Sequence, residues 1–312
     1  MNMAELTKKQ QGIVAAAAAY MADKGLTQAE LGHKSGVGPT YLNVMLGGGT
    51  HLNNTLIAAK YWNMLEALVN PAPALWPMLD TTQGLRIRAE LVQAKQKQLT
   101  RMIVAEPGAG KTMSVNWFKD NAPKHTYVIT MNDLMTVNDV LDTLERDLGV
   151  TGRTRRAMKL YDIILKLRDI RNSGGYPIII IEEAENMNMR TRKLLKAVFD
   201  GVDRYCALVL VGTPDLLTNV EKAKKSGKDA GPQFYRRFVP GLVRVAGINR
   251  NFDLFYKTHN VPDGLRKLLN TICENYGELN RWLEPVLEEC ATKGVDLTEE
   301  LFREVHNMPA YR

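Results

Sequence analysis

The sequence predicts an α/β protein: a core with a parallel sheet, preceded by a small all-α domain and followed by a small helical subdomain. Three observations indicate this class. Residues 1–66 read as helical, short β-rich runs alternate with longer amphipathic stretches over residues 85–250, and residues 251–312 read as helical again. Strands that alternate with helices are typical of parallel sheets, because each helix carries the chain back to start the next strand.

The composition is that of an ordinary globular chain of about two domains. The 312 residues are 45% hydrophobic and 24% charged, which excludes disordered, collagen-like and coiled-coil classes. Three widely spaced cysteines argue against a disulfide framework or a zinc cluster. The longest apolar run, residues 13–22, is too short for a membrane span, and no signal peptide precedes it. We therefore expect a soluble intracellular protein without membrane contacts.

Residues 28–47 fit a helix-turn-helix template position by position. Gly32 is the small residue where the two helices cross, and Gly36 lies in the turn, where a positive φ is needed. The apolar interior is predicted to be Leu31, Val37, Leu42 and Met45. The second helix of such a motif normally lies in the major groove of DNA, and a motif used only for protein contacts is the alternative. The predicted phosphate or groove contacts are Thr40, Tyr41 and Asn43.

A proline-rich segment separates this module from the rest of the chain. Pro71, Pro73 and Pro77 stop helices and favour extended backbone. We assign four parts on this basis: a helix-turn-helix domain at 1–66, a linker at 67–84, the α/β core at 85–250 and a helical C-terminal subdomain at 251–312.

The core is predicted to contain five strands, and the clearest is the run of four isoleucines before Glu182. A strand that is apolar throughout is typical of a central position covered on both faces. The predicted strands are 99–105, 127–131, 178–181, 207–212 and 242–247. The predicted helices around and after them are 113–120, 137–148, 155–172, 190–201, 253–258, 263–275, 279–292 and 298–306.

A glycine-rich loop follows the first predicted strand and precedes a helix. Its sequence over residues 105–112 is Ala-Glu-Pro-Gly-Ala-Gly-Lys-Thr, with Ala105 in place of the usual first glycine. Glycines let backbone N–H groups wrap round phosphates, and the helix start adds a favourable dipole. This phosphate-binding loop predicts ATP and Mg²⁺ as cofactors, with Lys111 reaching the β- and γ-phosphates and Thr112 ligating the metal. The predicted nucleotide contacts are Glu106, Pro107, Gly108, Ala109, Gly110, Lys111 and Thr112.

Two adjacent acids, Glu182 and Glu183, end the isoleucine strand. Adjacent residues of a strand point in opposite directions, so one carboxylate can face the metal while the next faces the attacking water. We assign Glu182 to the Mg²⁺ shell, although Asp is customary at that position, and Glu183 to the activation of water.

Three further segments resemble elements of AAA+ ATPases. Residues 208–213 form a buried strand that ends in a hydroxyl, residues 233–238 contain Arg-Arg-Phe, and residues 276–283 contain Gly-Glu-Leu-Asn-Arg. The resemblance implies that Thr213 orients the attacking water as sensor 1, with capping of the next turn as the alternative. It also implies that Arg237, or else Arg236, acts as an arginine finger on the γ-phosphate of a neighbouring subunit, with a surface ion pair as the alternative. Arg281 is the candidate for sensor 2, although the motif's own register falls on Asn280.

The positive charge is concentrated around the acidic strand. Residues 148–196 hold eleven Lys and Arg against five Asp and Glu, a net charge of +6 where the whole chain has +7. We expect this stretch to bind the phosphate backbone of double-stranded DNA, with a solvated basic face as the alternative. The predicted contacts are Arg153, Arg155, Arg156, Lys159, Arg190, Arg192 and Lys193.

The order of these features resembles the Mu B family of phage transposition proteins and the related transposon-encoded AAA+ regulators of the TnsC and TniB types. The resemblance implies an ATPase stimulated by DNA and transposase. The ATP form would assemble as a helical filament on duplex DNA with little sequence preference. It would recruit and activate a DDE transposase and govern target choice and immunity, in the cytoplasm of a bacterial host and associated with its nucleoid.

Other functions are compatible with the same residues. A helicase-loader or replication-initiator ATPase would co-purify with a replicative helicase. A helix-turn-helix transcription regulator that only senses nucleotide would give specific operator footprints and negligible hydrolysis. A P-loop kinase or metabolic ATPase is disfavoured by the helix-turn-helix and the basic stretch.

Overall fold

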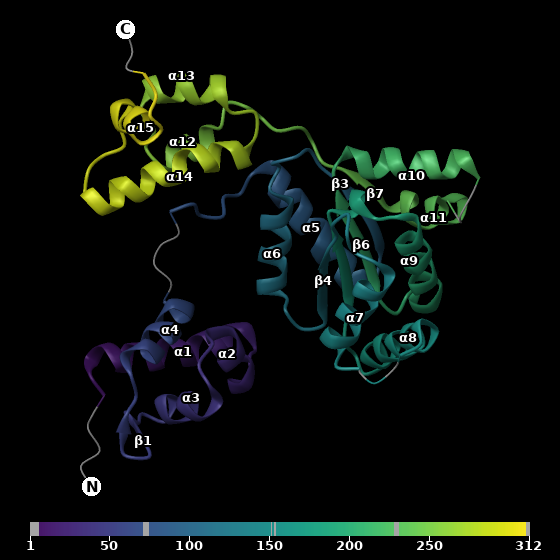
Figure 1. Cartoon of the computed structure of the whole chain (residues 1–312), viewed down its shortest axis with the longest axis horizontal. Helices are drawn as coiled ribbons and strands as arrows, with labels where there is room; N and C mark the ends of the chain where they lie inside the picture. The colour runs from purple at the N-terminus through teal and green to yellow at the C-terminus, as the bar shows by residue number, and fades with distance from the viewer. Residues whose placement is uncertain (1–5, 71–74, 151, 153, 228–230, 310–312) are drawn as a thin grey trace. The chain divides into compact units, whose positions relative to one another are not determined.

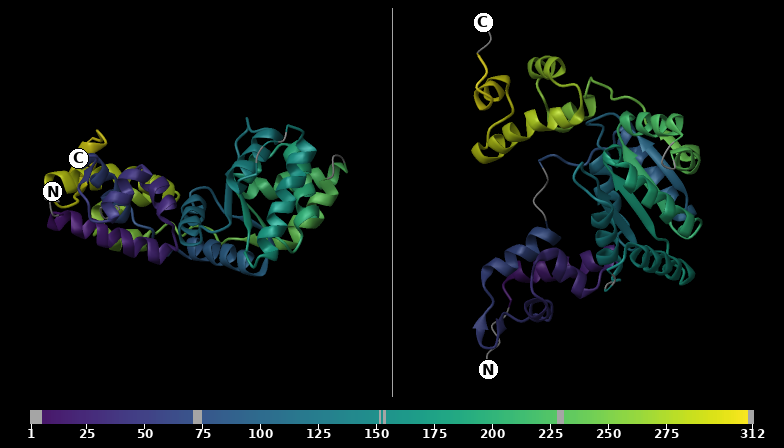
Figure 2. Two further views of the ribbon diagram at one scale, coloured as in Figure 1. Left: turned by 90° about the horizontal axis from the view of Figure 1, so that it is seen from below. Right: turned by 45° about the vertical axis from the view of Figure 1, so that its right-hand side comes forward.

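We describe residues 6–70, 75–150, 152, 154–227 and 231–309 of a computed structural model. The chain divides into two compact units, residues 1–77 and 78–312 (Figures 1 and 2). Each unit has a hydrophobic core of its own.

The first unit is a small helical domain with a short hairpin. Its elements are α1 (Lys8–Lys24), α2 (Gln28–Ser35), α3 (Pro39–Leu46), β1 (His51–Leu52), β2 (Thr55–Leu56) and α4 (Ala59–Val69). Thr7 and Thr27 begin α1 and α2 with capping boxes, in which the hydroxyl accepts from the backbone three residues on. The β1–β2 hairpin was not predicted, because two polar-flanked residues per strand leave no alternating pattern to detect.

The helix-turn-helix has the interior that the sequence predicts. The four predicted apolar side chains are at most 1% exposed and belong to the core of this unit. Gly36 has a φ of +70°, and a Cβ on Gly32 would lie 3.1 Å from the carbonyl oxygen of Val37. The two glycines therefore serve the turn and the close helix crossing, respectively.

The second unit is built on a parallel five-stranded sheet in the order β4-β5-β6-β3-β7. The strands are β3 (Thr100–Val104), β4 (Thr126–Thr130), β5 (Ile178–Glu182), β6 (Ala207–Gly212) and β7 (Leu242–Arg244). The first four lie within one residue of the predicted bounds. The edge strand β7 ends three residues early, because its only partner, β3, itself ends at Val104.

Helices cover both faces of this sheet (Figure 1). They are α5 (Thr82–Lys97), α6 (Lys111–Asn121), α7 (Val137–Leu148), α8 (Arg156–Asn172), α9 (Met189–Val202), α10 (Pro214–Ser226) and α11 (Gly231–Phe238). Alternate strand residues divide between two cores: Ile178 and Ile180 pack with α5 and α6, whereas Ile179 and Ile181 pack with α7 to α11. The isoleucine run is thus covered on both sides, as predicted.

Helix α5 begins at Thr82, inside the segment that the sequence assigns to the linker. The hydroxyl of Thr81 caps it by accepting from the N–H of Gly84 at 3.0 Å. Helix α4 likewise continues to Val69. Of the three prolines that suggested a linker, Pro71 and Pro73 lie outside the described residues.

Four helices complete the second unit: α12 (Asp253–Thr258), α13 (Asp263–Ile272), α14 (Tyr276–Lys293) and α15 (Glu299–Val305). Leu269, Leu283 and Phe302 are fully buried among them. Helix α14 begins three residues earlier than predicted, because the side chain of Asn275 accepts from the N–H of Glu278 at 2.9 Å and caps it.

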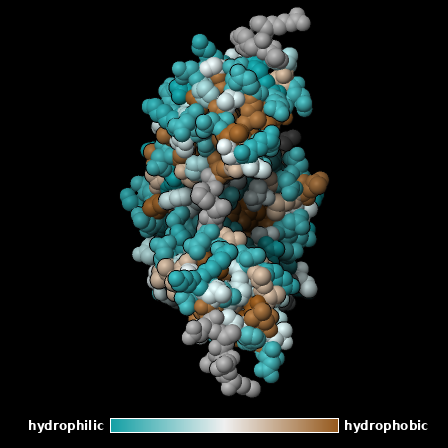
Figure 3. Space-filling model, turned by 90° about the vertical axis from the view of Figure 1, so that its left-hand side faces the viewer, coloured by the Kyte–Doolittle hydropathy of each residue, from teal (hydrophilic) through white to brown (hydrophobic). Residues whose placement is uncertain are grey.

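Within the described residues, no helix is both long and apolar enough to cross a bilayer. On the face shown in Figure 3, hydrophilic residues predominate and hydrophobic ones occur in small separate groups.

Candidate nucleotide-binding site

The glycine-rich loop joins β3 to α6 at the carboxyl end of the sheet (Figure 1). Gly108 and Gly110 have φ values of +71° and +82°, the left-handed region that lets a loop curl round a phosphate. Ala105 is buried, and its N–H donates to the carbonyl of Gly212 at 3.1 Å. A methyl group is thus accommodated where the usual motif has glycine.

Lys111 is 8% exposed at the first position of α6. Its Nζ donates to the carbonyl oxygens of Ala105 and Glu106, at 3.2 and 3.1 Å. Burial lowers the pKa of Lys111, and the negative charges of Glu185, Glu183 and Glu182 act in the opposite direction. The lysine predicted to reach the phosphates is therefore under the electrostatic influence of three carboxylates at and just after the end of β5.

Glu182 and Thr112 lie together, as a Mg²⁺ site requires. Burial raises the pKa of Glu182, and hydrogen bonds from Thr130 and Thr112 oppose that rise. The Thr130 hydroxyl lies 3.4 Å from Oε2 of Glu182. A hydroxyl and a carboxylate are oxygen ligands of the kind that Mg²⁺ accepts alongside nucleotide phosphates, so these residues fit the metal. No group of three or more His, Cys, Asp or Glu that could hold a metal occurs in the described part of the chain.

Glu183 follows β5 with a φ of +50°, a conformation that non-glycine residues seldom adopt. The half-buried residue begins a short 3₁₀ turn over Ala184–Asn186. Strained backbone of this kind is concentrated at functional sites, where the surrounding fold enforces it. The turn takes Glu183 out of the strand while its charge still acts on Lys111.

Thr213 lies between β6 and α10, at the same edge of the sheet. Its hydroxyl makes no capping hydrogen bond to α10, so the alternative interpretation of this residue as a cap is not supported. Its backbone N–H donates instead to Oε1 of Glu185 at 3.2 Å. Glu185 belongs to the predicted acidic element Glu-Glu-Ala-Glu, in which individual roles were predicted only for Glu182 and Glu183.

The start of α14 lies against the phosphate-binding loop, which the sequence did not predict. A Cβ on Gly108 would overlap the side chain of Asn275, and a Cβ on Gly277 would lie 3.7 Å from the Cα of Gly108. The hydroxyl of Tyr276 donates to the side chain of Gln83 at 3.0 Å. Contacts between residues so far apart in the chain leave no local signal except the cap at Asn275.

The two sensor 2 candidates lie further along α14. Arg281 is exposed, and the side chain of Asn280 donates to Glu284 at 3.1 Å. The residues of this segment that meet the loop are Asn275 and Gly277. The assignment of Arg281 to the nucleotide stays a prediction.

Arg237 lies at the opposite end of the sheet from the phosphate-binding loop. It lines a hollow of about 560 Å³ beside Thr100 and Gly241, which precede or begin strands β3 and β7. Its Nε and Nη2 both pair with Oδ1 of Asp200 at 2.6 Å. Burial raises the pKa of Asp200, but hydrogen bonds and charges from Arg237 and Lys196 lower it overall. A finger role in a neighbouring subunit therefore requires Arg237 to leave this ion pair, whereas Arg236 is exposed.

The predicted DNA contacts of the helix-turn-helix differ in exposure. Thr40 and Asn43 are exposed on α3. Tyr41 is half-buried and stacks on Tyr61 with ring centroids 4.3 Å apart. Two of the three side chains are thus open to a ligand, and the third is held against its own domain.

The basic residues of the core also fall into different environments. Arg155 and Arg156 are exposed at the start of α8, and Arg190 and Lys193 are exposed on α9. Lys159 forms ion pairs with Asp142 and, at 2.9 Å, with Glu145. Arg192 is half-buried, with a pKa lowered by burial. Arg153 lies outside the described residues. We therefore leave Lys159 and Arg192 out of the DNA surface proposed below.

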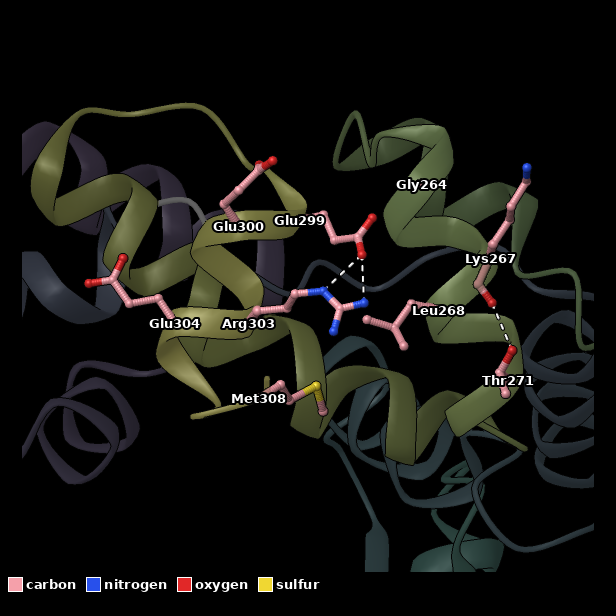
Figure 4. Close-up of a pocket in the computed structure, with 9 residues that line it drawn as sticks. All are labelled: Gly264, Lys267, Leu268, Thr271, Glu299, Glu300, Arg303, Glu304 and Met308. Carbon is pink, nitrogen blue, oxygen red and sulfur yellow. Dashed lines mark hydrogen bonds and ion pairs between the residues drawn. The ribbon is translucent and has the colours of Figure 1, made fainter. Parts of the chain in front are cut away.

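A separate hollow of about 790 Å³ lies between α13 and α15 (Figure 4). Arg303 points into it and pairs with Glu299 at 2.7 Å, while Leu268 and Met308 supply apolar lining. None of the predicted site residues lines this hollow.

Comparisons with known proteins agree with this geometry. Residues 94–220 match the family described as an AAA domain. The structure is similar to that of Cdc6p from Pyrobaculum aerophilum, with a TM-score of 0.52 and 15% identity over 77% of this chain and 71% of that one. It is also similar to the ADP form of the ORC2 protein from Aeropyrum pernix, with a TM-score of 0.51 and 15% identity over 75% and 70% of the two chains. No curated protein matches the sequence. Residues 94–220 thus match an AAA domain, and the second unit has the AAA+ P-loop fold seen in Cdc6p and ORC2.

Proposed function

We propose that this chain is an ATPase that binds duplex DNA in its ATP-bound form. One observation carries the proposal: the Thr112 hydroxyl is hydrogen-bonded to Glu182 next to the buried Lys111. Both residues follow a loop whose glycines, Gly108 and Gly110, have positive φ values. These groups have the charges and ligand types that a magnesium nucleotide requires.

Each residue of the site has a distinct task. The loop N–H groups and Lys111 bind the phosphates, while Thr112 and Glu182 hold the cation. Bound Mg²⁺–ATP supplies the phosphoanhydride bond that is cleaved. Glu183 accepts a proton from the attacking water, and Thr213 orients that water. Arg237 or Arg236 would act as an arginine finger on the nucleotide of a second copy of the chain.

The proposed DNA surface combines exposed cations of the core with the helix-turn-helix. Arg155, Arg156, Arg190 and Lys193 would contact phosphates, and Thr40 and Asn43 would assist from α3. Such contacts recognise the backbone rather than base edges, so we expect little sequence preference.

For the biological role, we propose a regulator of DNA transposition that assembles as a filament and activates a DDE transposase. Its support is the order of helix-turn-helix, ATPase core and helical tail. The likeness of the fold to Cdc6p and ORC2 favours a second candidate, a replication-initiator or helicase-loader ATPase. Stimulation of the ATPase by a purified DDE transposase, compared with a replicative helicase, discriminates between the two roles.

Electron microscopy with duplex DNA tests the shared part of the proposal. We expect filaments with a non-hydrolysable ATP analogue and none without it. Lys111→Ala should abolish them, because the phosphates lose their buried cation, whereas Lys222→Ala on the exposed face of α10 should not. Equal DNA binding with and without nucleotide, or binding confined to one operator sequence, would overturn the proposal.

A further inference from the structure

Glu185 is the third carboxylate at the nucleotide site, and neither the metal nor the attacking water has been assigned to it. It lies in the 3₁₀ turn after β5, two residues beyond Glu183. Its backbone carbonyl accepts from the side chain of Asn219 at 3.4 Å, which ties the turn to α10. The residue therefore bridges two segments that follow neighbouring strands.

The two oxygens of the Glu185 carboxylate have different surroundings. Oε1 accepts from the N–H of Thr213 at 3.2 Å. Oε2 is buried and accepts no hydrogen bond from the described residues. An unsatisfied buried acceptor loses its hydration without compensation, so such an atom in a native protein calls for a partner that the described residues do not supply.

The fold makes room for this oxygen at the end of β6. A Cβ on Gly212 would overlap Oε2 of Glu185, so only glycine allows the carboxylate to lie there. Glu185 also acts on Lys111 more strongly than Glu183 or Glu182 does, although burial has the larger effect on the pKa of that lysine. The unsatisfied oxygen is thus buried against the tip of β6, and the charge of its carboxylate acts on the lysine of the phosphate-binding loop.

The chemistry of the missing partner follows from that of the carboxylate. An ionised carboxylate only accepts hydrogen bonds, so Oε2 repels phosphate oxygens and needs a donor. Two of the three donors of Lys111 go to Ala105 and Glu106, and no hydrogen bond joins its Nζ to Oε2. A water molecule held beside the bound phosphates is the donor that fits.

We propose that Glu185 is a positioning residue of the ATPase site, which holds the tip of β6 through Oε1 and orients a phosphate-side water through Oε2. This inference rests on the proposed ATPase function. In this role Glu185 fixes the position of Thr213 near the phosphates, because its carboxylate accepts a hydrogen bond from the Thr213 backbone N–H.

Two substitutions separate the roles of the two oxygens. Glu185→Ala removes both acceptors. Glu185→Gln keeps a carbonyl acceptor for the N–H of Thr213 but replaces the second oxygen with a donor. Glu221→Gln, on the exposed side of α10, is the matched control for the same chemical change.

Hydrogen–deuterium exchange of the nucleotide-free protein tests the hydrogen bond between the Thr213 N–H and Oε1 of Glu185. We expect faster exchange of the Thr213 amide in Glu185→Ala and protection close to wild type in Glu185→Gln. Unchanged exchange in Glu185→Ala would overturn the positioning role. This measurement needs no ATPase activity, so it tests the positioning role even if the proposed function is wrong.

Steady-state kinetics test the role of Oε2. In Glu185→Gln we expect kcat to fall about tenfold, the rate equivalent of one lost hydrogen bond, with the KM for ATP within about threefold of wild type. A kcat equal to that of Glu221→Gln would overturn the water-orienting role. Absence of ATPase activity in the wild-type protein would instead refute the proposed function itself.

Discussion

At the scale of single residues, Glu183 combines backbone strain with a predicted chemical role. Its positive φ lifts it out of β5 beside Lys111, Glu182 and the turn that carries Glu185. A residue in that conformation costs about 1–3 kcal/mol and is retained where the fold enforces it.

Glu183→Gln tests whether this residue activates water. The side chain keeps its size but loses its basicity, so we expect kcat to fall by about 100-fold or more, with ATP binding retained. Filaments formed with ATP should then persist, as seen by electron microscopy over time. A turnover rate equal to that of Glu221→Gln would contradict the assignment.

Gly108 and Gly110 offer a second test at this scale. Both have positive φ, so alanine at either position costs about 1–2 kcal/mol in backbone strain. A Cβ at 110 meets open space, whereas a Cβ at 108 overlaps Asn275. We expect Gly108→Ala to lower the free energy of unfolding more than Gly110→Ala, measured by urea denaturation without nucleotide. Equal losses would mean that α14 does not rest on the loop.

The sequence predicted local features of the site better than distant contacts. The glycine loop, Lys111 and the paired acids are contiguous motifs whose spacing carries their chemistry. Asn275 and Gln83 join the site through contacts between segments more than 150 residues apart, which a single sequence does not encode locally. Lys159 looked like a free cation because its partners, Asp142 and Glu145, lie on the preceding helix.

At the scale of elements, the buried strands were the most predictable. β5 is apolar up to Glu182 and β6 is apolar throughout, and their predicted bounds agree with the structure to within one residue. Helices α5, α10 and α11 were missed. Helix α5 begins with the polar residues Thr82 and Gln83, and α10 begins at a proline, Pro214. The buried faces of these helices are defined by their packing on the sheet, which the sequence of each helix alone does not indicate.

The start of α8 is the element on which the DNA proposal can be tested. Arg155 and Arg156 are exposed there, so Glu at both positions should weaken duplex binding. If both contact phosphates, the salt dependence of log K should lose about two units of slope. The matched control is Lys222→Glu with Lys225→Glu on α10, which changes the net charge equally. Equal weakening in fluorescence anisotropy titrations would show that only total charge matters.

At the scale of the whole molecule, the two units have separate cores, and every residue of the nucleotide site belongs to the second. We therefore expect residues 78–312 alone to bind a fluorescent ATP analogue with the affinity of the full chain. Their affinity for duplex DNA should be lower, because Thr40 and Asn43 are removed. A tenfold loss of nucleotide affinity would show that the first unit contributes to the site.

The two hydrogen bonds of Lys111 to its own loop have a consequence for ligand selection. Two of the three donors of the ammonium group are already used before any nucleotide arrives, so the carbonyls of Ala105 and Glu106 compete with an incoming ligand for them. For these two donors, an incoming ligand gains only the difference in hydrogen-bond strength between its own oxygens and the two carbonyls. Charged phosphate oxygens form stronger bonds than neutral carbonyls, whereas sugar and base atoms do not. We therefore expect the loop to select anionic ligands, because only a charged oxygen binds Lys111 more strongly than the two backbone carbonyls do.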